Sequence, residues 1–373
     1  MAAQVSVASV SDGWINVGDA EREAAERLEP GQLGYFAGGA GEELTLTENL
    51  EAWRRWRFRP RVLVDTSAIS TESELFGAPL SMPLLVAPVA YQRLAHPDGE
   101  LGMAAAAAAA GTVMCLSTLA TTRPSEIAAA VPNGRRWFQL YQFRDEAITR
   151  ALSEEAVAAG FEAIVVTVDA PPGGNRERDR RTGFEIPADV GVPSVTAALG
   201  AERAITIAET FELMTRAMGW SDFADLASEA GVPVLVKGIL TPEDAALAAE
   251  HGAAAVVVSN HGGRQLDRSP ATADVLGEIV DAVDGRVPVL VDGGIRRGVD
   301  VAIALALGAD AVLVGRPALW GLAAGGEEGA ARVLAMLRAE LELTLALCGC
   351  TSPAELSRSH VQRAPATSVY SRL

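Results

Sequence analysis

The chain has 373 residues and a formal net charge of −17, from 31 Lys and Arg against 48 Asp and Glu. Hydrophobic residues make up 49% and charged residues 21%, which is typical of a globular protein with a large core. The acidic balance argues against a nucleic-acid or membrane partner, because both need a basic surface, and three cysteines are too few for a disulfide framework.

The N-terminal sequence and the few histidines bear on the protein's location and on metal binding. The first 14 residues lack the basic and apolar regions of a signal peptide, and no run of 18 apolar residues suggests a transmembrane helix. We therefore expect a cytoplasmic protein. With four histidines and no Cys/His cluster, we expect no metal site.

Short apolar runs recur along the chain and predict its strands. Each run has four to eight residues, is rich in β-branched residues or Leu, and lacks polar alternation. This is typical of parallel strands that are covered on both faces. The predicted strands lie within residues 83–90, 112–118, 137–141, 163–169, 232–238, 254–260, 287–294 and 311–316.

Helical patterns rich in Ala, Leu and Glu separate these runs. They cover residues 99–110, 126–131, 145–159, 242–251, 272–283 and 299–307. Eight strand–helix repeats favour an α/β fold with a single (β/α)8 TIM barrel. The alternative is a doubly wound open sheet, which would need an edge strand, and none of the eight runs is typical of one. We expect one domain over residues 1–373, with an N-terminal extension at 1–80 and the barrel at 81–350.

Two segments fall outside the repeat. In the first 80 residues we expect helices near 19–28 and 45–56, a short β-prone piece, and packing that plugs one end of the barrel. Residues 171–226 are too many for a plain crossover, and their charged, Gly-rich first half predicts a mobile loop that acts as a lid. A helix is expected within residues 205–218.

Chemistry in such a barrel lies at the C-terminal ends of the strands, and the predicted strands end in polar groups. The seventh and eighth end in DGGIRRG and GRP, where free backbone N–H groups and arginines favour a phosphate. The alternative is that these glycines only form tight turns. Lys237 ends the fifth strand, where its buried charge requires a ligand or an ion pair, for which Asp292 is the candidate.

His261 is the one histidine placed at a strand's C-terminal end, and we interpret it as a catalytic base. Arg264 follows three residues later as a group for an anionic substrate, and Asp169 on another strand could orient the imidazole. A phosphate anchor, a lysine, a base and an arginine together fit flavin mononucleotide (FMN), because Lys237 could stabilise negative charge on a reduced flavin ring.

At SNHGGRQLD (residues 259–267) the chain resembles the FMN-dependent 2-hydroxy acid oxidases and dehydrogenases, which include glycolate oxidase, lactate oxidase and 4-hydroxymandelate oxidase. The resemblance extends through YFAGGAGEELTLTEN, FRPRVLVD, APVAYQRLAHPDGE, FQLYQFRD, TVDAP, VLVKGI, DGGIRRGVDVAIALALGA, VGRP and SRSH. It therefore covers nearly the whole chain.

The resemblance implies a role for each matching residue. His261 would be the base with Asp169 as its partner, Tyr141 and Lys237 would complete the catalytic set, and the substrate would contact Tyr35, Tyr141, Arg176 and Arg264. The flavin would lie against Pro88, Val89, Ala90, Ser117, Gln139, Thr167, Lys237 and Ser259. Ribityl and phosphate would lie against Asp292, Gly293, Gly294, Ile295, Arg296, Gly315 and Arg316.

The implied activity is oxidation of an (S)-2-hydroxy acid to the 2-oxo acid, with dioxygen as acceptor and hydrogen peroxide as product. The alternative within the family is a dehydrogenase that passes electrons to a quinone or a protein. Leu119 replaces a Trp of glycolate oxidases, and Val89 departs from their A-P-T-A, so we expect a substrate larger than glycolate. A homotetramer or larger homo-oligomer is also implied. Two other classes of protein are disfavoured. An IMP-dehydrogenase-like enzyme would need a nucleophilic Cys near His261, and this chain has none there. A non-catalytic flavin-binding protein would not need the full set of polar residues found here.

Overall fold

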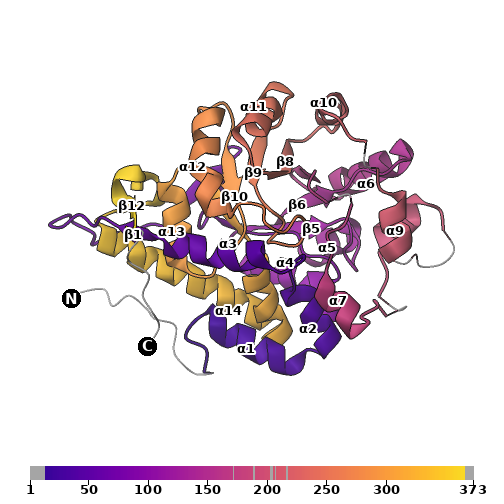
Figure 1. Ribbon diagram of the computed structural model, residues 1–373, viewed down its shortest axis with the longest axis horizontal. Coiled ribbons are helices and arrows are strands. Elements are labelled where there is room, and N and C mark those ends of the chain that lie inside the picture. Colours follow the sequence, from indigo (N-terminus) through magenta and orange to yellow (C-terminus); the bar gives the residue numbers. More distant parts are fainter. Residues whose placement is uncertain are drawn as a thin grey trace.

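The computed structural model describes residues 13–365 except 171, 188–189, 202–204, 206 and 216. Its centre is a closed barrel of eight parallel strands in the order β10-β11-β4-β5-β6-β7-β8-β9 (Figure 1). The strands are β4 (Leu84–Val86), β5 (Val113–Ser117), β6 (Arg135–Leu140), β7 (Ile164–Thr167), β8 (Val234–Ile239), β9 (Ala255–Val258), β10 (Val289–Val291) and β11 (Ala311–Val314).

Each of the eight predicted strands is confirmed. β4 pairs with β11 as well as with β5, so the sheet is closed, which confirms the predicted barrel and excludes the alternative of an open sheet. Every strand residue of β4, β5 and β7 is buried, which explains the continuous apolar runs. The parallel register pairs Thr167 of β7 with Lys237 of β8. The residues that follow each strand therefore meet at one mouth of the barrel.

The helices between the strands form the outer layer. These are α4 (Gly99–Ala109), α5 (Pro124–Ala130), α6 (Glu146–Ala158), α11 (Pro242–Glu250), α12 (Thr272–Val283), α13 (Gly298–Ala306) and α14 (Arg316–Cys348), and the first six confirm the prediction. The sequence reading missed α14, whose two halves meet at non-helical Gly325 and Gly326. Short 3-10 turns are η1 (Gln92–Leu94), η2 (Pro353–Glu355) and η3 (Arg358–His360).

The N-terminal residues do more than plug the barrel. They form α1 (Val17–Arg27), α2 (Pro30–Ala37), α3 (Leu44–Arg54) and β1 (Trp56–Phe58), which pairs with β12 (Val361–Arg363), and α1 lies along α14 (Figure 1). The plug is the hairpin of β2 (Ser73–Leu75) and β3 (Ala78–Leu80). Its Leu75 and Leu80 join the cluster inside the barrel, and Phe76 packs on Trp137 with ring centroids 5.7 Å apart.

The segment between β7 and β8 carries four helices, α7 (Glu177–Thr182), α8 (Pro193–Ala198), α9 (Ile207–Leu213) and α10 (Trp220–Glu229). Within the part predicted as a mobile loop, the charged residues form α7, and ion pairs within this helix and to the N-cap of α3 contact them. The helix expected over residues 205–218 is shorter, and residue 171 at the segment's predicted start lies outside the described residues.

A buried carboxylate joins the loops that follow β4 and β5. Glu100 on α4 has no exposed surface, and one of its oxygens accepts the backbone N–H groups of Gln92 at 3.0 Å and Thr121 at 2.9 Å. The other oxygen accepts the hydroxyls of Thr121 and Thr122. Because every acceptor is used, this contact fixes two loops of the mouth relative to each other.

Across the described part of the chain, no helix is both long enough and apolar enough to cross a membrane.

Glu100→Ala is expected to lower the free energy of unfolding by about 3 kcal/mol, because it leaves buried N–H and hydroxyl donors without a partner. Chemical denaturation followed by circular dichroism measures this change. Glu154→Ala, on the exposed face of α6, is the control and is expected to change it by less than about 0.5 kcal/mol. Equal effects of the two substitutions would contradict the role given to Glu100.

Candidate active site

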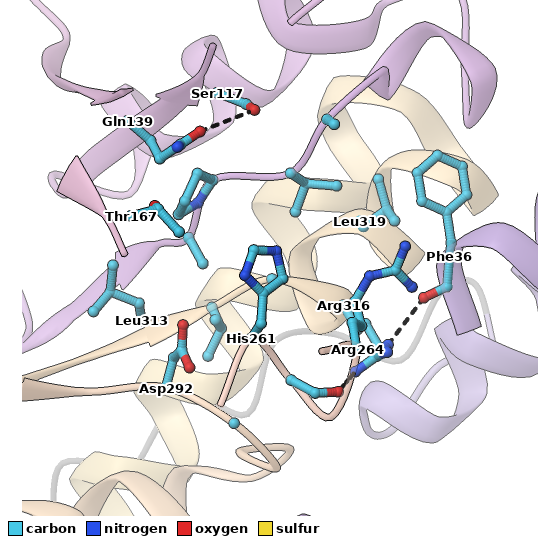
Figure 2. A pocket seen from close by; sticks show the side chains of 18 of the residues that line it. Phe36, Ser117, Gln139, Thr167, His261, Arg264, Asp292, Leu313, Arg316 and Leu319 are labelled. Carbon is cyan, nitrogen blue, oxygen red and sulfur yellow. Dashed lines mark hydrogen bonds between the residues drawn. The ribbon is translucent and has the colours of Figure 1, made fainter. Parts of the chain in front are cut away.

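The C-terminal ends of the barrel strands surround a cavity (Figure 2). Backbone and side chains from all eight strand ends contribute to it, together with α2, α9 and the start of α14. Of the predicted site residues, those that line the cavity are Tyr35, Pro88, Val89, Ala90, Ser117, Gln139, Tyr141, Thr167, Arg176, Lys237, His261, Arg264, Asp292, Gly293, Gly294, Ile295, Arg296, Gly315 and Arg316.

His261 and Asp169 form a hydrogen-bonded pair between the ends of β9 and β7. Nδ1 of His261 lies 2.9 Å from Oδ1 of Asp169, so the tautomer with a proton on Nδ1 leaves Nε2 as the free acceptor. The backbone of His261 has a left-handed φ of 56°, which is strained for a non-glycine residue. Its N–H donates to Ser259 Oγ at 3.0 Å, and this bond helps to hold the strained turn.

Burial and charge set the protonation of this pair. Burial lowers the pKa of the His261 imidazole below its usual value, and the charge and hydrogen bond of Asp169 oppose that effect. Burial would raise the pKa of the Asp169 carboxyl, but the interactions with His261 and Lys237 outweigh it, so its pKa is lowered. The arrangement therefore favours a neutral imidazole beside an ionised carboxylate at neutral pH.

Lys237 is an ion-paired lysine at the end of β8. Its side chain is 5% exposed, and its Nζ lies 3.0 Å from Oδ2 of Asp292 and donates to Ser259 Oγ at 2.9 Å. The pairing expected with Asp292 is confirmed. Burial would lower the pKa of Lys237, but Asp292 and Asp169 raise it above its usual value, which keeps a positive charge at the cavity wall.

Two predicted residues stand behind the cavity wall instead of lining it. Asp169 reaches the cavity through His261, and Ser259, predicted to contact flavin, is fully buried with its hydroxyl between Lys237 and the His261 N–H. In this structure the Ser259 hydroxyl contacts two residues that line the cavity, and its contact with flavin stays a prediction.

The fit of a flavin can be tested on polar atoms that lack partners. Gln139 Nε2, Thr167 Oγ1 and Asp292 Oδ1 are buried at the cavity and have no hydrogen-bond partner in the described structure. Ser117 donates to Gln139 Oε1 at 3.2 Å, so the amide is oriented with its NH₂ unpaired (Figure 2). Buried groups of this kind are satisfied by water or a ligand. The donor and acceptor edge of an isoalloxazine ring fits Gln139 and Thr167, and a ribityl hydroxyl fits the acceptor oxygen of Asp292.

Glycines allow tight turns and close packing of the chain at the other end of the cavity. Gly293 and Gly294 have φ values of 92° and 80°, and a Cβ on Gly294 would lie 2.0 Å from the carbonyl oxygen of Asn49. Gly315 precedes the first turn of the long helix α14, whose N-terminus is a favourable place for an anion. Arg296 is half-buried beside these turns, so the residues present fit the ribityl phosphate of FMN.

Arg316 is more fully engaged than the sequence suggested. Its guanidinium donates to the carbonyl oxygen of Phe36 at 2.9 Å (Figure 2). It also donates to the carbonyl oxygens of Gly262 and Gly38, each at 2.9 Å. These bonds tie α2 to the loop after β9. Burial, with Arg264 and Arg296 nearby, lowers the pKa of Arg316.

Two further guanidinium groups meet over one aromatic ring. The Cζ atoms of Arg264 and Arg176 lie 5.2 Å and 5.9 Å from the ring centroid of Tyr35. Burial and the charge of Arg176 lower the pKa of Arg264 to about 10. Among the described residues neither arginine is ion-paired with a carboxylate, and Arg264 donates to the carbonyl oxygens of Tyr35 at 2.7 Å and Gly38 at 2.8 Å. Guanidinium groups without a carboxylate partner are suited to a small anion. Tyr141 lies at the same cavity, and burial raises the pKa of its hydroxyl.

Sequence reasoning missed mainly apolar members of the cavity. Phe36, Phe211 and Leu319 line it, yet each belongs to a helix that was not predicted or was predicted with other bounds. These apolar residues belong to no polar motif. The sequence could have placed them at the cavity only if the bounds of their helices had been predicted correctly.

Comparisons with known proteins agree with this geometry. The model of the family described as FMN-dependent dehydrogenase matches residues 24–363. An L-lactate oxidase of Nostoc sp. is 46% identical over 354 residues, which cover 92% of this chain and 97% of that protein. A glycolate oxidase of Oryza sativa is 46% identical, with 93% and 95% covered. A solved mandelate oxidase with (S)-4-hydroxymandelic acid is 43% identical, with a TM-score of 0.88 and 94% and 99% covered.

The family model spans most of the chain, the relatives align over almost their whole length, and the cavity fits the cofactor that the family's name requires. The chain belongs to the FMN-dependent dehydrogenase family.

Proposed function

We propose that this protein oxidises an (S)-2-hydroxy acid to the 2-oxo acid with FMN, and that dioxygen is the electron acceptor. The observation that carries the proposal is the convergence of the His261–Asp169 pair and the Arg264–Arg176 pair on one cavity. The relatives named as lactate, glycolate and mandelate oxidases support it. The overall reaction converts the 2-hydroxy acid and O₂ into the 2-oxo acid and H₂O₂.

The chain's own residues bind and orient the acid. Arg264 and Arg176 hold its carboxylate, because two guanidinium groups without an ion-pair partner face the same space. Tyr35 lies beneath both cations, and Tyr141 offers a hydroxyl that burial keeps protonated. These contacts place the hydroxyl-bearing carbon within reach of the free nitrogen of His261.

His261 accepts the proton that the substrate loses, at Nε2, while Asp169 stabilises the imidazolium that forms. FMN, when bound, would accept the two electrons of the oxidation and would pass them on to dioxygen. Gln139, Thr167 and Lys237 would hold its ring, and the ion-paired Lys237 places positive charge where negative charge develops. The segment from Asp292 to Arg296, with Gly315 and Arg316, would hold its ribityl phosphate, and Pro88, Val89, Ala90 and Ser117 would border the ring.

Substrate size, assembly and location complete the proposal. Leu119 lines the cavity. Because Leu is smaller than the Trp of glycolate oxidases, it supports a substrate larger than glycolate. The resemblance to the family supports a homotetramer or larger homo-oligomer, which light scattering would measure. The composition supports a cytoplasmic protein.

Residues 171–226 would act as a lid, because Arg176 and Phe211 of this segment line the cavity.

Oxygen uptake with peroxide detection tests the acceptor. The FMN-loaded protein should consume one dioxygen and form one peroxide for each 2-hydroxy acid oxidised. Oxidation that proceeds with a quinone but not with dioxygen would instead establish the alternative, a dehydrogenase.

His261→Ala should lower kcat at least about 1,000-fold, because no other group at the cavity replaces the proton acceptor. The flavin absorbance band should be retained, since the binding residues are unchanged. His251→Ala, at the end of α11, is the matched control and should keep near-normal turnover. Normal turnover in His261→Ala would show that the base is assigned wrongly.

The pH profile of Asp169→Asn reports on the pair. In the unaltered protein kcat/KM should fall as the pH drops through the pKa of His261, because only the neutral imidazole accepts a proton. Asp169 raises that pKa against the effect of burial, so its removal should lower the pKa and move the acidic limb to lower pH. The plateau should fall about 100-fold. An acidic limb that stays in place would contradict the coupling.

Arg264→Lys keeps a positive charge but loses the planar, forked donor. We expect KM to rise about 10-fold to 100-fold with a smaller change in kcat. Arg268→Lys, in the same loop but exposed and paired with Glu42, is the control and should change neither constant by more than about twofold. An unchanged KM in Arg264→Lys would exclude Arg264 from carboxylate binding.

A further inference from the structure

Three consecutive residues after β9 adopt the left-handed backbone conformation. His261, Gly262 and Gly263 have φ values of 56°, 65° and 75°. Glycine adopts this conformation at little cost, but a histidine does not, so contacts with the surrounding chain must hold the turn. Because His261 is the first of the three residues, those contacts also decide where its imidazole lies.

Asn260 closes this turn from the position before it. The backbone N–H of Gly263 donates to the carbonyl oxygen of Asn260 at 3.0 Å and to its side-chain Oδ1 at 3.1 Å. Nδ2 of Asn260 donates to the carbonyl oxygen of Pro270 at 3.0 Å. One side chain, 4% exposed, therefore joins the start of the loop that carries His261 and Arg264 to its end.

The amide of Asn260 is itself held by a second amide. Nδ2 of Asn49, on α3, donates to Oδ1 of Asn260 at 2.9 Å, and Nδ2 of Asn260 donates to Oδ1 of Asn49 at 2.8 Å. With the bonds to Gly263 and Pro270, both hydrogens and both acceptor positions of the Asn260 amide are used. The amide therefore has one orientation, in which its oxygen faces the N–H of Gly263.

Asn49 lies outside the cavity. It is a buried residue of α3 and is not among the described residues that line the cavity. Its side chain reaches His261 only through Asn260 and the turn that Asn260 closes. Any effect of Asn49 on the reaction must therefore be transmitted through the position of other residues.

Arg264 lies in the same loop but is held by other contacts. Its guanidinium donates to the carbonyl oxygens of Tyr35 and Gly38, at 2.7 Å and 2.8 Å. Loss of the amide pair leaves both of these bonds in place. The two amides are thus expected to act on the histidine of the loop and not on its arginine.

We propose that Asn49 and Asn260 form a positioning pair, which fixes the strained turn of His261 so that Nε2 faces the reacting carbon of the substrate. The inference rests on the proposed function, because it explains how the proton acceptor of that reaction is held. Breaking a buried amide pair leaves polar groups without a partner, so the turn would relax. A catalytic group displaced by about 1 Å loses up to about 100-fold in rate.

Asn49→Ala tests the proposal, because it removes the second amide and changes no residue of the cavity. Anaerobic reduction of the bound flavin is followed by stopped-flow absorbance, with the fastest substrate among (S)-lactate, (S)-mandelate and glycolate. The limiting rate constant should fall about tenfold to 100-fold. The dissociation constant of the acid should change less than about threefold, because Arg264 stays in place.

Asn49→Ser is the second variant, and it serves if Asn49→Ala does not fold or does not retain FMN. Its hydroxyl keeps one hydrogen-bonding group in the space of the amide. The rate constant should again fall while the dissociation constant stays within about threefold, and the fall should be smaller than in Asn49→Ala. The flavin absorbance band and thermal unfolding show that each variant is folded and loaded.

Thr45→Val is the matched control. The hydroxyl of Thr45, also on α3, donates to the carbonyl oxygen of Ser269 at 3.0 Å, so the substitution removes a buried bond between the same helix and the same loop. It leaves the turn of His261 unchanged. Both constants should therefore change less than about threefold.

A second comparison uses His261→Ala, in which there is no imidazole to position. Adding Asn49→Ala to this variant should lower its residual reduction rate less than about twofold, because two residues that act through one group are not additive. A slow anaerobic absorbance assay measures this residual rate.

Three results would overturn the positioning role while the proposed function stands. These are an unchanged rate constant in both Asn49 variants, an equal loss in Thr45→Val, and the full loss from Asn49→Ala in the His261→Ala background. The last two would show that α3 acts through general packing. Failure of every 2-hydroxy acid to reduce the flavin of the unaltered protein would instead overturn the proposed function itself.

Discussion

The hydrogen bond between Nδ1 of His261 and Oδ1 of Asp169 is the contact on which the account depends. It joins the ends of two barrel strands, fixes the tautomer of the imidazole and directs the second ring nitrogen to the cavity. The bond also lowers the pKa of the Asp169 carboxyl, which burial alone would raise. Without it, a strained and buried histidine would have no defined orientation at the mouth of the barrel.

A network of buried charges surrounds this pair. Lys237 is paired with Asp292 and hydrogen-bonded to Ser259, which in turn accepts the backbone N–H of His261. The Ser259 hydroxyl therefore links the lysine expected at the flavin with His261, the histidine that we propose as the proton acceptor. Arg264 and Arg176 add positive charge at the same cavity, and a bound anion would neutralise it.

Much of the fold was readable from the sequence because a parallel barrel imposes a local signal. Strands buried on both faces give continuous apolar runs, and their ends carry the polar residues, so His261, Lys237 and Asp292 could be placed at one mouth. The helix α14 was missed because Gly325 and Gly326 interrupt its pattern. The motif resemblance supplied roles that spacing alone could not.

The rest of the site depends on contacts between distant segments. The left-handed backbone of His261, the three bonds from Arg316 to carbonyl oxygens and the contacts of the Ser259 hydroxyl depend on how distant segments meet. Such features follow from tertiary packing, which local sequence patterns do not encode.

The most direct test is the visible spectrum of the purified protein before and after a 2-hydroxy acid is added without oxygen. The account predicts a flavin absorbance band that bleaches on addition of an (S)-2-hydroxy acid and returns when air is admitted. Absence of the band after FMN is supplied, or a band that no 2-hydroxy acid bleaches, would contradict it.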